Sequence, residues 1–506
     1  MTRGENECYP PNMDWIVSLT PEVSDDPITA LASPPEGASV VELRLDLFPG
    51  IDIGAAVSAC PLPVLATLRS TAEGGRGSDD PATRSETLAS ARDAGAALVD
   101  LEHARDDRLI NALGLPPEQI VLSWHDPEGT PADLERIASE LLESPARIAK
   151  LIPTAENLMD LERVLALHQR FNTCRSRNRR LMTFAMGTVG IASRYLAPLL
   201  GPPLSFAAWR ADAAAAPGQH TVAQLEAVVG HLQGPPRRLF GVVGGDVSRS
   251  LSPAIHNAGY GALDLPYLFL PVSVPDPRDL EDLFADLGHT LFDRVGLAAH
   301  GWAVTTPYKD IAAAAAEMAA PRVRRAEAAN TLVLREAGMA ADNTDADGVV
   351  ASLLSIGIDA RGRTAVVQGT GGAGRGAAIG LHLAGADVSL RGRDAERTRE
   401  FAEMLEIDAL EPGAMPKTAE ILVNATPLGT QPGDDSAFTD DEIKGAVAVV
   451  DMVYGAEETA LIARANAAGI AAADGKTVLV HQAFAQFAAF TTRMPPKEAM
   501  LKAIGR

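Results

Sequence analysis

The sequence of 506 residues contains only three cysteines, Cys8, Cys60 and Cys174. Such a small, odd-numbered set without metal-binding spacing argues against a disulfide framework and fits a reducing cytoplasm. Long apolar runs are also missing, since the alanine-rich stretch 311–320 contains Glu317 and is too short to span a bilayer. The first seven residues are polar and acidic, unlike a signal peptide. We therefore expect a cytoplasmic protein with no membrane partner.

Positive charge is scarce: 44 Lys and Arg stand against 66 Asp and Glu, a net charge of −22. This balance argues against nucleic acid or anionic membranes as partners. An anionic substrate must then be bound by local arginines rather than attracted by the overall field. The composition is otherwise ordinary for a globular protein, with 46% hydrophobic and 22% charged residues. The length exceeds what one hydrophobic core supports and predicts two to four compact units.

Strand-like runs alternate with helix-length segments through the first 210 residues. There are eight such runs: 15–19, 40–47, 64–69, 97–102, 120–126, 147–152, 181–187 and 204–209. Eight β/α units in about 200 residues predict a closed (β/α)8 barrel, whose reactive groups lie at the carboxyl ends of the strands. Several reactive or polar side chains occur toward those ends: Glu42, Arg44, Arg69, Glu102, His125, Lys150 and Met186.

A linker with two prolines, 233–238, precedes a second α/β segment that begins at 239–244 and extends to about 345. A third segment, from 364, has the strand, glycine turn, helix and strand of a Rossmann unit. The helical stretch 480–492 is expected to return to the second segment. The sequence thus predicts an α/β protein: a barrel at 12–232, a second domain at 237–345 completed by 475–506, and a Rossmann domain at 346–474.

Lys150 and His125 are the parts of an imine-forming site. A partly desolvated lysine has a lowered pKa, and the like charges of Arg44, Arg69 and Arg194 act in the same direction. The neutral amine can attack a ketone, and the iminium then accepts electrons from the neighbouring carbon. His125 can take the proton from that carbon and pass it to a departing hydroxyl.

Two further side chains complete this prediction. Glu73 is placed to hold the imidazole tautomer through a carboxylate–histidine hydrogen bond. Arg194 has the planar fork that matches a substrate carboxylate. Each residue alone has a structural explanation, because a lysine at a strand end is usually solvated. The prediction therefore depends on the whole constellation.

The motifs of this half resemble those of type I 3-dehydroquinate dehydratases, in order across 12–232. They are 41–46, 67–69 with 73–75, 123–126, Lys150, 185–187 with 193–194, and 216–219. The resemblance implies that Lys150 is the Schiff-base lysine and His125 the general acid and base. It also implies five substrate ligands: Glu42, Arg44, Arg69, Arg194 and Gln219. Ala215 departs from the usual serine, which removes one hydroxyl contact but not the chemistry.

The second half contains a separate set of polar candidates. Ser250 and Ser252 lie two residues apart in a turn, where they can face one carboxylate or simply cap the helix that begins at Pro253. Lys309 and Asp345 form a plausible proton-transfer pair for reducing a ketone, and Asn330 can bind ring hydroxyls. No cluster of His, Cys or Asp has metal spacing, so we expect hydride transfer without a metal.

A glycine-rich turn follows the strand-like run 364–367 and predicts a dinucleotide site. Its phosphate-binding residues are expected to be Gly369, Gly371, Gly372 and Ala373. The next strand ends in a cationic segment where Arg393 and Arg397 can hold a 2′-phosphate, which favours NADP over NAD. Asp394 is expected to cap the following helix.

This half resembles shikimate dehydrogenases from about 237 to the C-terminus. The matching motifs are 250–253, 305–309, 330–331, 343–345, the glycine turn, 424–429, 451–454 and Gln482. The resemblance implies Lys309 and Asp345 as the catalytic pair. It implies substrate binding by Ser250, Ser252, Thr305, Asn330 and Gln482, and a nicotinamide side lined by Ala425, Thr426 and Met452. Ala303 and Arg249 depart from the usual asparagine and histidine.

Together the two resemblances imply consecutive steps of the shikimate pathway of aromatic amino acid biosynthesis. The first half would dehydrate 3-dehydroquinate to 3-dehydroshikimate, and the second would reduce that ketone with NADPH to shikimate. We expect small-molecule partners only, and a monomer or homodimer. A quinate-preferring dehydrogenase, an unrelated Schiff-base aldolase and a non-catalytic metabolite sensor are the alternatives. The presence of Lys150, His125 and Lys309 argues against the sensor, and Ser250 and Thr305 favour shikimate.

Overall fold

The computed structural model describes residues 13–172, 180–234, 236–285, 289–292, 295–431, 433–455 and 457–506. Cys8, Cys174 and the first seven residues, on which expectations were placed above, lie outside these ranges. Cys60 is half-buried and free. The chain forms two compact units. One runs to Leu239 and includes Asp246–Arg249 and Pro266–Ala299; the other comprises Phe240–Gly245, Ser250–Leu265 and His300–Arg506.

The first unit contains an eight-stranded parallel sheet in the order β7-β6-β5-β4-β3-β2-β1-β8. The strands are β1 (Asp14–Leu19), β2 (Val40–Arg44), β3 (Val64–Thr67), β4 (Leu98–Glu102), β5 (Ile120–His125), β6 (Ile148–Ile152), β7 (Leu181–Thr183) and β8 (Leu204–Ala208). Because β8 pairs with β1 in parallel, the sheet curls into a nearly closed barrel. The (β/α)8 prediction is confirmed, and all eight strands overlap the predicted runs, although β2 ends at Arg44 and β7 at Thr183, earlier than predicted.

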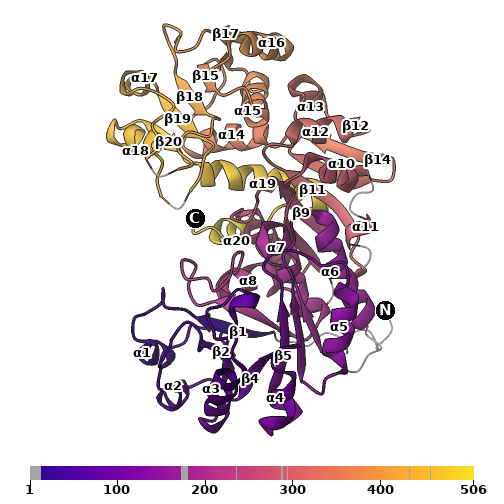
Figure 1. The fold of residues 1–506 in the computed structure, drawn as a ribbon. Helices are drawn as coiled ribbons and strands as arrows, with labels where there is room; N and C mark the ends of the chain where they lie inside the picture. Colours follow the sequence, from indigo (N-terminus) through magenta and orange to yellow (C-terminus); the bar gives the residue numbers. More distant parts are fainter. Residues whose placement is uncertain are drawn as a thin grey trace. The chain divides into compact units, whose positions relative to one another are not determined.

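Helices follow the barrel strands and surround them, in indigo to magenta in Figure 1. They are α1 (Pro27–Leu31), α2 (Ile53–Ala59), α3 (Pro81–Asp93), α4 (Asp107–Ala112), α5 (Leu134–Glu143), α6 (Leu158–Phe171), α7 (Gly187–Leu200) and α8 (Val222–Val229). Short 3-10 turns cover Thr71–Glu73 and Pro117–Gln119. Asparagine, aspartate and threonine begin several of these helices; the Thr221 side chain, for example, forms a capping box with Gln224.

The inward-facing side chains of the strands are apolar in the middle of the barrel and polar at its mouth. Every second residue faces inward, and the inward apolar residues form one buried cluster that includes Ile16, Leu65, Val121, Ile148 and Phe206. Two residues further along their strands, the same face carries Ser18, Thr67, Ser123 and Lys150 instead. The apolar layers therefore hold the polar layer at the carboxyl ends of the strands.

The second sheet has six strands in the order β10-β9-β11-β13-β14-β12. They are β9 (Arg238–Gly244), β10 (Tyr267–Ser273), β11 (Ala299–Val304), β12 (Met318–Ala319), β13 (Thr331–Arg335) and β14 (Gly338–Asp342). The associated helices are α9 (Ser252–Ala262), α10 (Pro277–Ala285), α11 (His289–Phe292), α12 (Lys309–Ala315) and α13 (Pro321–Ala326). β13 and β14 form an antiparallel hairpin whose turn residue Gly338 has φ 116°, a conformation that favours glycine.

The third sheet is parallel, with the doubly wound order β17-β16-β15-β18-β19-β20. Its strands are β15 (Thr364–Gln368), β16 (Asp387–Arg391), β17 (Asp408–Leu410), β18 (Ile421–Asn424), β19 (Ala448–Asp451) and β20 (Ala471–Ala473). The helices are α14 (Asp345–Ser355), α15 (Gly372–Leu383), α16 (Ala395–Leu405), α17 (Asp440–Gly445) and α18 (Ala460–Ala467). This is the Rossmann arrangement that the sequence predicted.

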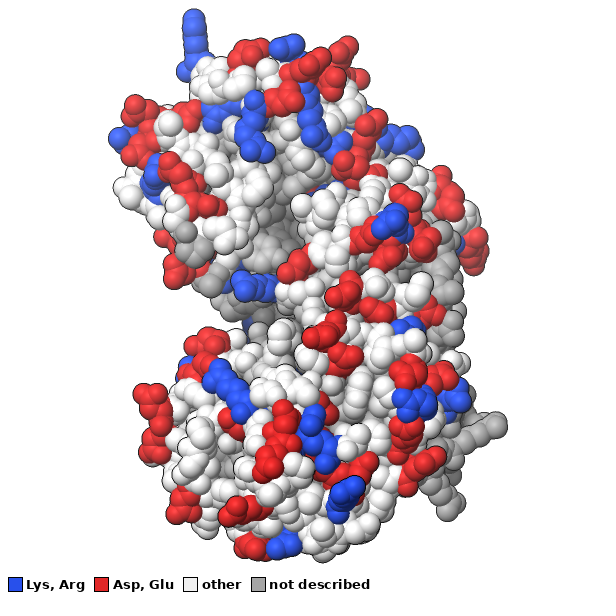
Figure 2. All heavy atoms as spheres, in the orientation of Figure 1, with Lys and Arg blue, Asp and Glu red and all other residues white. Residues whose placement is uncertain are grey.

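Two C-terminal helices, α19 (Gly475–Thr491) and α20 (Lys497–Lys502), follow this sheet. α19 packs against α9, where the Phe487 ring centroid lies 5.4 Å from that of Tyr260. Gly259 permits this approach, since a Cβ there would lie 2.7 Å from the Phe487 ring. In the described part of the chain, no helix combines the length and the apolar character needed to cross a bilayer. Acidic and basic side chains are interspersed on the face shown in Figure 2.

Two candidate active sites

Lys150 lies inside the barrel, in the middle of β6. Its side chain is buried, with Nζ 3.7 Å from the centroid of the Phe206 ring and 3.8 Å from Asp100 Oδ2. Burial lowers the pKa of Lys150; the charges of Asp100 and Glu42 oppose this shift, and those of Arg69 and Arg44 add to it. The amine is therefore easier to deprotonate than an exposed lysine, as imine formation requires.

His125 ends the neighbouring strand β5 and is held by Glu73. Its Nδ1 lies 2.9 Å from Glu73 Oε2, and its backbone N–H donates to the same oxygen at 3.1 Å. Burial, with the charges of Arg69, Lys150 and Arg44, lowers the pKa of His125 well below its usual value. Burial also raises the pKa of Glu73 to about 8, although Arg69 opposes that shift. The structure thus brings together the pair that the sequence proposed.

Strand register puts the histidine and the lysine on one interior face. Ser123 pairs with Lys150, and His125 with Ile152, across β5 and β6. Since residues two apart share a face, His125 lies one step above Ser123 and beside the lysine. The barrel mouth therefore presents an amine and an imidazole to the same space.

Arg44 and Arg69, predicted as substrate ligands, have carboxylate partners within the barrel. Arg44 forms a two-bond pair with Asp46, with both distances 2.8 Å. Arg69 donates to Asp100 at 2.9 Å, to Glu102 at 3.0 Å and to Glu73 at 2.9 Å. These bonds fix the two guanidinium groups in position.

Glu42 and Gln219 are also held by neighbours. The Glu42 carboxylate accepts hydrogen bonds from Ser18 at 2.6 Å and Thr67 at 2.9 Å. Gln219 Oε1 accepts the backbone N–H of Ala215 at 2.8 Å. The loop that lacks the expected serine hydroxyl is thus closed by Gln219.

Arg194 differs from the other two arginines. It lies on α7, is buried, and packs over the Phe184 ring at 4.6 Å. Its Nη2 donates to the carbonyl of Pro217 at 3.1 Å, and its Nε has no hydrogen-bond partner among the described atoms. Burial lowers the pKa of Arg194 to about 10. A buried guanidinium with unused donors is suited to a substrate carboxylate.

Sequence reasoning did not identify several residues of this site. Asp100, Ser123 and Phe206 all contact Lys150 or Arg69; Ser123 was noted only as part of the motif 123–126, and none of the three was assigned a role. A signal was available for Asp100, because it shares the inward face of its strand with Glu102, which was noted.

The second unit brings four predicted residues into one hydrogen-bonded network. Lys309, at the start of α12, forms an ion pair with Asp345, at the start of α14. Asn330 donates to Asp345 Oδ1 at 3.0 Å and to Gln482 Oε1 at 2.8 Å. The side-chain amide oxygen of Asn330, Oδ1, accepts the backbone N–H of Thr344 at 2.8 Å. Lys309, Asp345 and Asn330 are all buried, so the ion pair and its hydrogen bonds are largely removed from the protein surface.

The remaining substrate candidates lie near the ends of β9 and β11. The Thr305 N–H donates to the Val243 carbonyl at 2.8 Å. The Ser252 N–H donates to Ser250 Oγ at 3.3 Å, which is the local turn expected as the structural alternative. Ser250 also contacts the Tyr454 hydroxyl, and burial raises the pKa of that tyrosine.

The glycine turn lies directly against Lys309. A Cβ on Gly372 would lie 2.8 Å from Lys309 Cβ, whereas one on Gly371 would meet nothing within 4 Å. Gly369 has φ 123° and approaches the Ala425 carbonyl, and Gly374 in turn lies against the Gly369 carbonyl. The turn is therefore closed toward the protein and open at Gly371, which suits a dinucleotide pyrophosphate.

Other predicted cofactor residues surround this turn. Arg393 and Arg397 are exposed, and Arg397 lies 5.3 Å from the Phe401 ring. Asp394 caps α16 through the N–H groups of Glu396 and Arg397, as expected. Thr426 donates to Asn424 Oδ1 at 2.7 Å, and the Met452 N–H donates to the Asn424 carbonyl at 2.9 Å. The strand ends thus converge beside the glycine turn.

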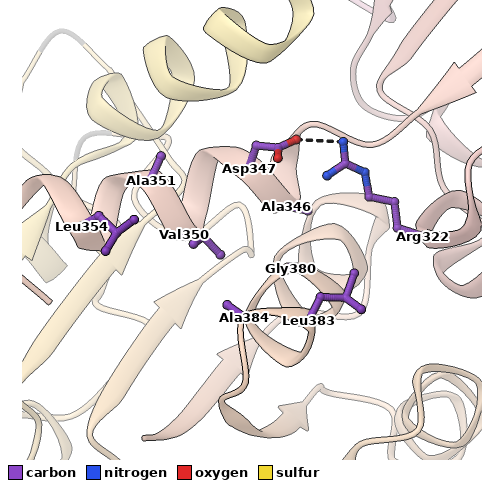
Figure 3. Close-up of a pocket in the computed structure, with 9 residues that line it drawn as sticks. All are labelled: Arg322, Ala346, Asp347, Val350, Ala351, Leu354, Gly380, Leu383 and Ala384. Atoms are coloured by element: carbon purple, nitrogen blue, oxygen red, sulfur yellow. Dashed lines mark ion pairs between the residues drawn. The ribbon is translucent and has the colours of Figure 1, made fainter. Parts of the chain in front are cut away.

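A cavity of about 370 Å³ lies elsewhere, between α14 and α15 (Figure 3). It is lined mainly by apolar residues, with the Arg322–Asp347 ion pair at 2.8 Å on its edge. Its α14 residues, from Ala346 to Leu354, lie on the helix face opposite Asp345. This cavity is therefore not part of the Lys309–Asp345 site. In the described chain, no group of His, Cys, Asp or Glu side chains could hold a metal ion.

The fold and the two sites define a class of protein: a (β/α)8 barrel with a lysine–histidine centre, joined to an α/β module that contains a Rossmann-type sheet and a lysine–aspartate centre. Family models agree. Residues 16–235 match type I 3-dehydroquinase, 242–332 the substrate binding domain of shikimate dehydrogenase, and 477–504 the C-terminal domain of shikimate 5′-dehydrogenase.

Relatives cover both halves of the chain. A chloroplastic bifunctional 3-dehydroquinate dehydratase/shikimate dehydrogenase of Arabidopsis thaliana is 28% identical over 91% of this chain and 79% of its own. A shikimate dehydrogenase (NADP(+)) of Rubrobacter xylanophilus is 33% identical over 53% of this chain and 95% of its own. The solved dehydroquinate dehydratase and shikimate dehydrogenase of S. pombe covers 98% of this chain and 99% of its own, at 22% identity and a TM-score of 0.44. The chain belongs to the shikimate dehydrogenase family, and its first half carries the type I 3-dehydroquinase domain.

Proposed function

We propose that this chain is a bifunctional enzyme of the shikimate pathway. Its barrel dehydrates 3-dehydroquinate to 3-dehydroshikimate through an imine on Lys150, and its second unit reduces 3-dehydroshikimate to shikimate. The observation that carries the proposal is the pairing of two buried centres in one chain, Lys150 with His125 and Lys309 with Asp345. The family of each half supports the same pair of reactions.

In the barrel, the neutral Lys150 amine attacks the ring ketone, and water leaves as the iminium forms. His125 Nε2 then takes a proton from the carbon beside the iminium, whose positive charge accepts the electron pair. The same imidazole returns the proton to the hydroxyl that departs as water, and hydrolysis releases the ketone. Glu73 holds the imidazole through Nδ1, and Arg194 binds the substrate carboxylate. Glu42, Arg44, Arg69 and Gln219 position the ring hydroxyls.

In the second unit, NADPH when bound supplies the hydride that adds to the ketone carbon. Lys309 and Asp345 give a proton to the ketone oxygen, while Asn330 and Gln482 orient the ring. The substrate carboxylate is bound by the hydroxyls of Ser250, Ser252 and Thr305. The cofactor residues are Gly369, Gly371, Gly372 and Ala373 for the pyrophosphate, Arg393 and Arg397 for the 2′-phosphate, and Ala425, Thr426 and Met452 beside the nicotinamide.

The proposal extends to organisation and setting. The functional domains are 12–232, 237–345 with 475–506, and 346–474, and the protein acts as a monomer or homodimer. A cytoplasmic location agrees with the free thiol of Cys60. NADP rather than NAD is the cofactor, supported by the exposed arginines after β16 and by the NADP-dependent relatives.

Borohydride reduction tests the barrel chemistry directly. When the protein is mixed with dehydroquinate and borohydride, we expect a stable mass adduct on the peptide that contains Lys150. The Lys150→Met variant is the control and should stay unmodified. An unmodified Lys150 in the unsubstituted protein would contradict the imine mechanism. Replacing dehydroshikimate and shikimate with quinate in the dehydrogenase assay separates the main proposal from a quinate-preferring enzyme.

A further inference from the structure

Asp100 is a fully buried carboxylate that the mechanism above does not use. It lies in the middle of β4, between Val99 and Leu101. Its Oδ1 accepts hydrogen bonds from Arg69 at 2.9 Å and from the Ser123 hydroxyl at 2.5 Å. Its Oδ2 has no hydrogen-bond partner among the described atoms and lies 3.8 Å from Lys150 Nζ. A buried carboxylate oxygen without a partner is costly and calls for an explanation.

The other carboxylates around Lys150 are already occupied. Both oxygens of Glu42 accept hydroxyl protons, from Ser18 and Thr67. Glu102 accepts from Arg69 and the Ser70 N–H through one oxygen and from Arg105 through the other. Glu73 serves His125 and Arg69. Asp100 Oδ2 is therefore the acceptor left available to the amine.

We propose that Asp100 is the proton acceptor for Lys150 during imine formation. The barrel then has two proton acceptors with different roles. Asp100 handles the protons of the nitrogen, and His125 handles the proton of the neighbouring carbon. This inference rests on the proposed imine chemistry. It also explains why Asp100 is held so firmly: Arg69 and Ser123 fix Oδ1, and so aim Oδ2 at Nζ.

The proton balance closes without any further reactant. Asp100 takes one proton from the Lys150 ammonium, and the neutral amine adds its electron pair to the ketone carbon. The ketone oxygen becomes a hydroxyl by taking a proton from the nitrogen it has just joined. Asp100 returns its proton to that hydroxyl, which leaves as water while the carbon–nitrogen double bond forms. The nitrogen has lost two protons, both present in the water, and Asp100 is again a carboxylate.

The Asp100→Asn variant isolates Oδ2. The asparagine amide has one oxygen and one nitrogen. Because the guanidinium of Arg69 only donates hydrogen bonds, the amide oxygen is expected to keep the place of Oδ1 and accept from Arg69 and Ser123. The amide nitrogen then takes the place of Oδ2 next to Lys150. Asp106→Asn is the matched control. Asp106 is an equally buried carboxylate that lies between β4 and α4, and it is paired with Arg84 at 2.6 Å rather than with Lys150.

The measurement is the rate of imine formation. The protein is mixed with dehydroquinate and quenched with borohydride at successive times, and the modified fraction of the Lys150 peptide is determined by mass spectrometry. We expect Asp100→Asn to slow this rate about 100-fold, within the usual range for loss of an acid–base group. The deuterium isotope effect for substrate labelled at the carbon beside the ketone should fall toward one, because imine formation becomes rate-limiting. Asp106→Asn should match the unsubstituted protein in both readouts.

Two results would overturn the inference. If Asp100 only stabilised the ammonium, its removal would favour the neutral amine, and imine formation at neutral pH would become faster. An unchanged rate with an unchanged isotope effect would exclude any role in proton transfer. The reduction of dehydroshikimate by the second unit reports that the variant chain is folded. Absence of an adduct in the unsubstituted protein would instead contradict the imine chemistry itself.

Discussion

Glu73 and His125 form one proton-sharing pair, with 2.9 Å between Glu73 Oε2 and His125 Nδ1. The backbone N–H of His125 donates to the same oxygen, so the carboxylate is fixed to the residue that it orients. Arg69 donates to that oxygen as well, at 2.9 Å. This geometry leaves Nε2 of the imidazole for the substrate.

The pair predicts how dehydration depends on pH. Burial raises the pKa of Glu73 to about 8 and lowers that of His125, so below pH 8 the pair holds two protons and Nε2 is protonated. The pair loses one proton as the pH rises through 8, and Nε2 becomes a base. We therefore expect kcat/KM for dehydration to rise with pH and to be half-maximal near 8.

The Glu73→Gln variant tests whether the Glu73–His125 pair causes this rise of kcat/KM with pH. Without the carboxylate, the rise of kcat/KM with pH should occur below pH 6.5, because only His125 with its lowered pKa remains to titrate. The plateau rate should fall about tenfold or more, as the tautomer is less well fixed. The exposed Glu143→Gln serves as the control, with an unchanged profile. If kcat/KM in Glu73→Gln were still half-maximal near pH 8, the pH dependence would belong to another titrating group.

Much of the barrel site was predictable because position along a strand determines it. Reactive residues on the inward face of regular strands, such as Lys150 in the middle of β6 and His125 at the end of β5, can be predicted from the alternation of side chains. Asp100 has the same central position in β4 that Lys150 has in β6, but an inward carboxylate alone indicates no particular reaction. Only the structure shows that Asp100 Oδ2 lies 3.8 Å from Lys150 Nζ. Phe206 was missed because an aromatic residue in a buried strand is expected to belong to the hydrophobic core.

Lys309→Met should abolish most dehydrogenase turnover. The amine that pairs with Asp345 is lost, and we expect a fall of about 100-fold or more in dehydroshikimate reduction. Dehydration should stay nearly intact, since Lys150 and Lys309 belong to different units. Both activities are measured on the same preparation. Equal loss of both would mean that the units do not function independently.

Adjacent glycines of the cofactor turn should respond differently to alanine. A Cβ at Gly372 would lie 2.8 Å from Lys309 Cβ, so Gly372→Ala should displace the lysine and lower kcat for reduction. Gly371→Ala meets no protein atom, so it should raise KM for NADPH while leaving thermal stability unchanged. Steady-state kinetics and a thermal melt distinguish the two. Identical effects would show that the turn does not approach Lys309 in solution.

Arg397→Ala tests the choice of nicotinamide cofactor. Loss of a charge-assisted hydrogen bond to the 2′-phosphate, worth roughly 1.5–3 kcal/mol, should raise KM for NADPH about tenfold or more. KM for NADH should not change. Arg399→Ala is the control on the same helix, since Arg399 is exposed and lies 3.7 Å from Glu411. A similar rise for both cofactors would argue against a 2′-phosphate contact.

The second unit shows where prediction from sequence ends. The strand and glycine turn at 364–374 were visible because glycine is required where the backbone approaches itself closely, as at Gly369 and Gly374. The short strands β12, β17 and β20 were not predicted, since two or three residues carry too little periodicity. The Asn330 network joins residues more than 150 positions apart, and only folding brings Gln482 to Asn330.

The central claim is that one chain carries out both reactions in sequence. The most direct measurement supplies dehydroquinate and NADPH to the purified protein and follows the absorbance of NADPH. We predict oxidation of NADPH with dehydroquinate as the sole carbon substrate, and loss of that signal in Lys150→Met unless dehydroshikimate is added. NADPH oxidation with dehydroshikimate but none with dehydroquinate, in the unsubstituted protein, would contradict the account.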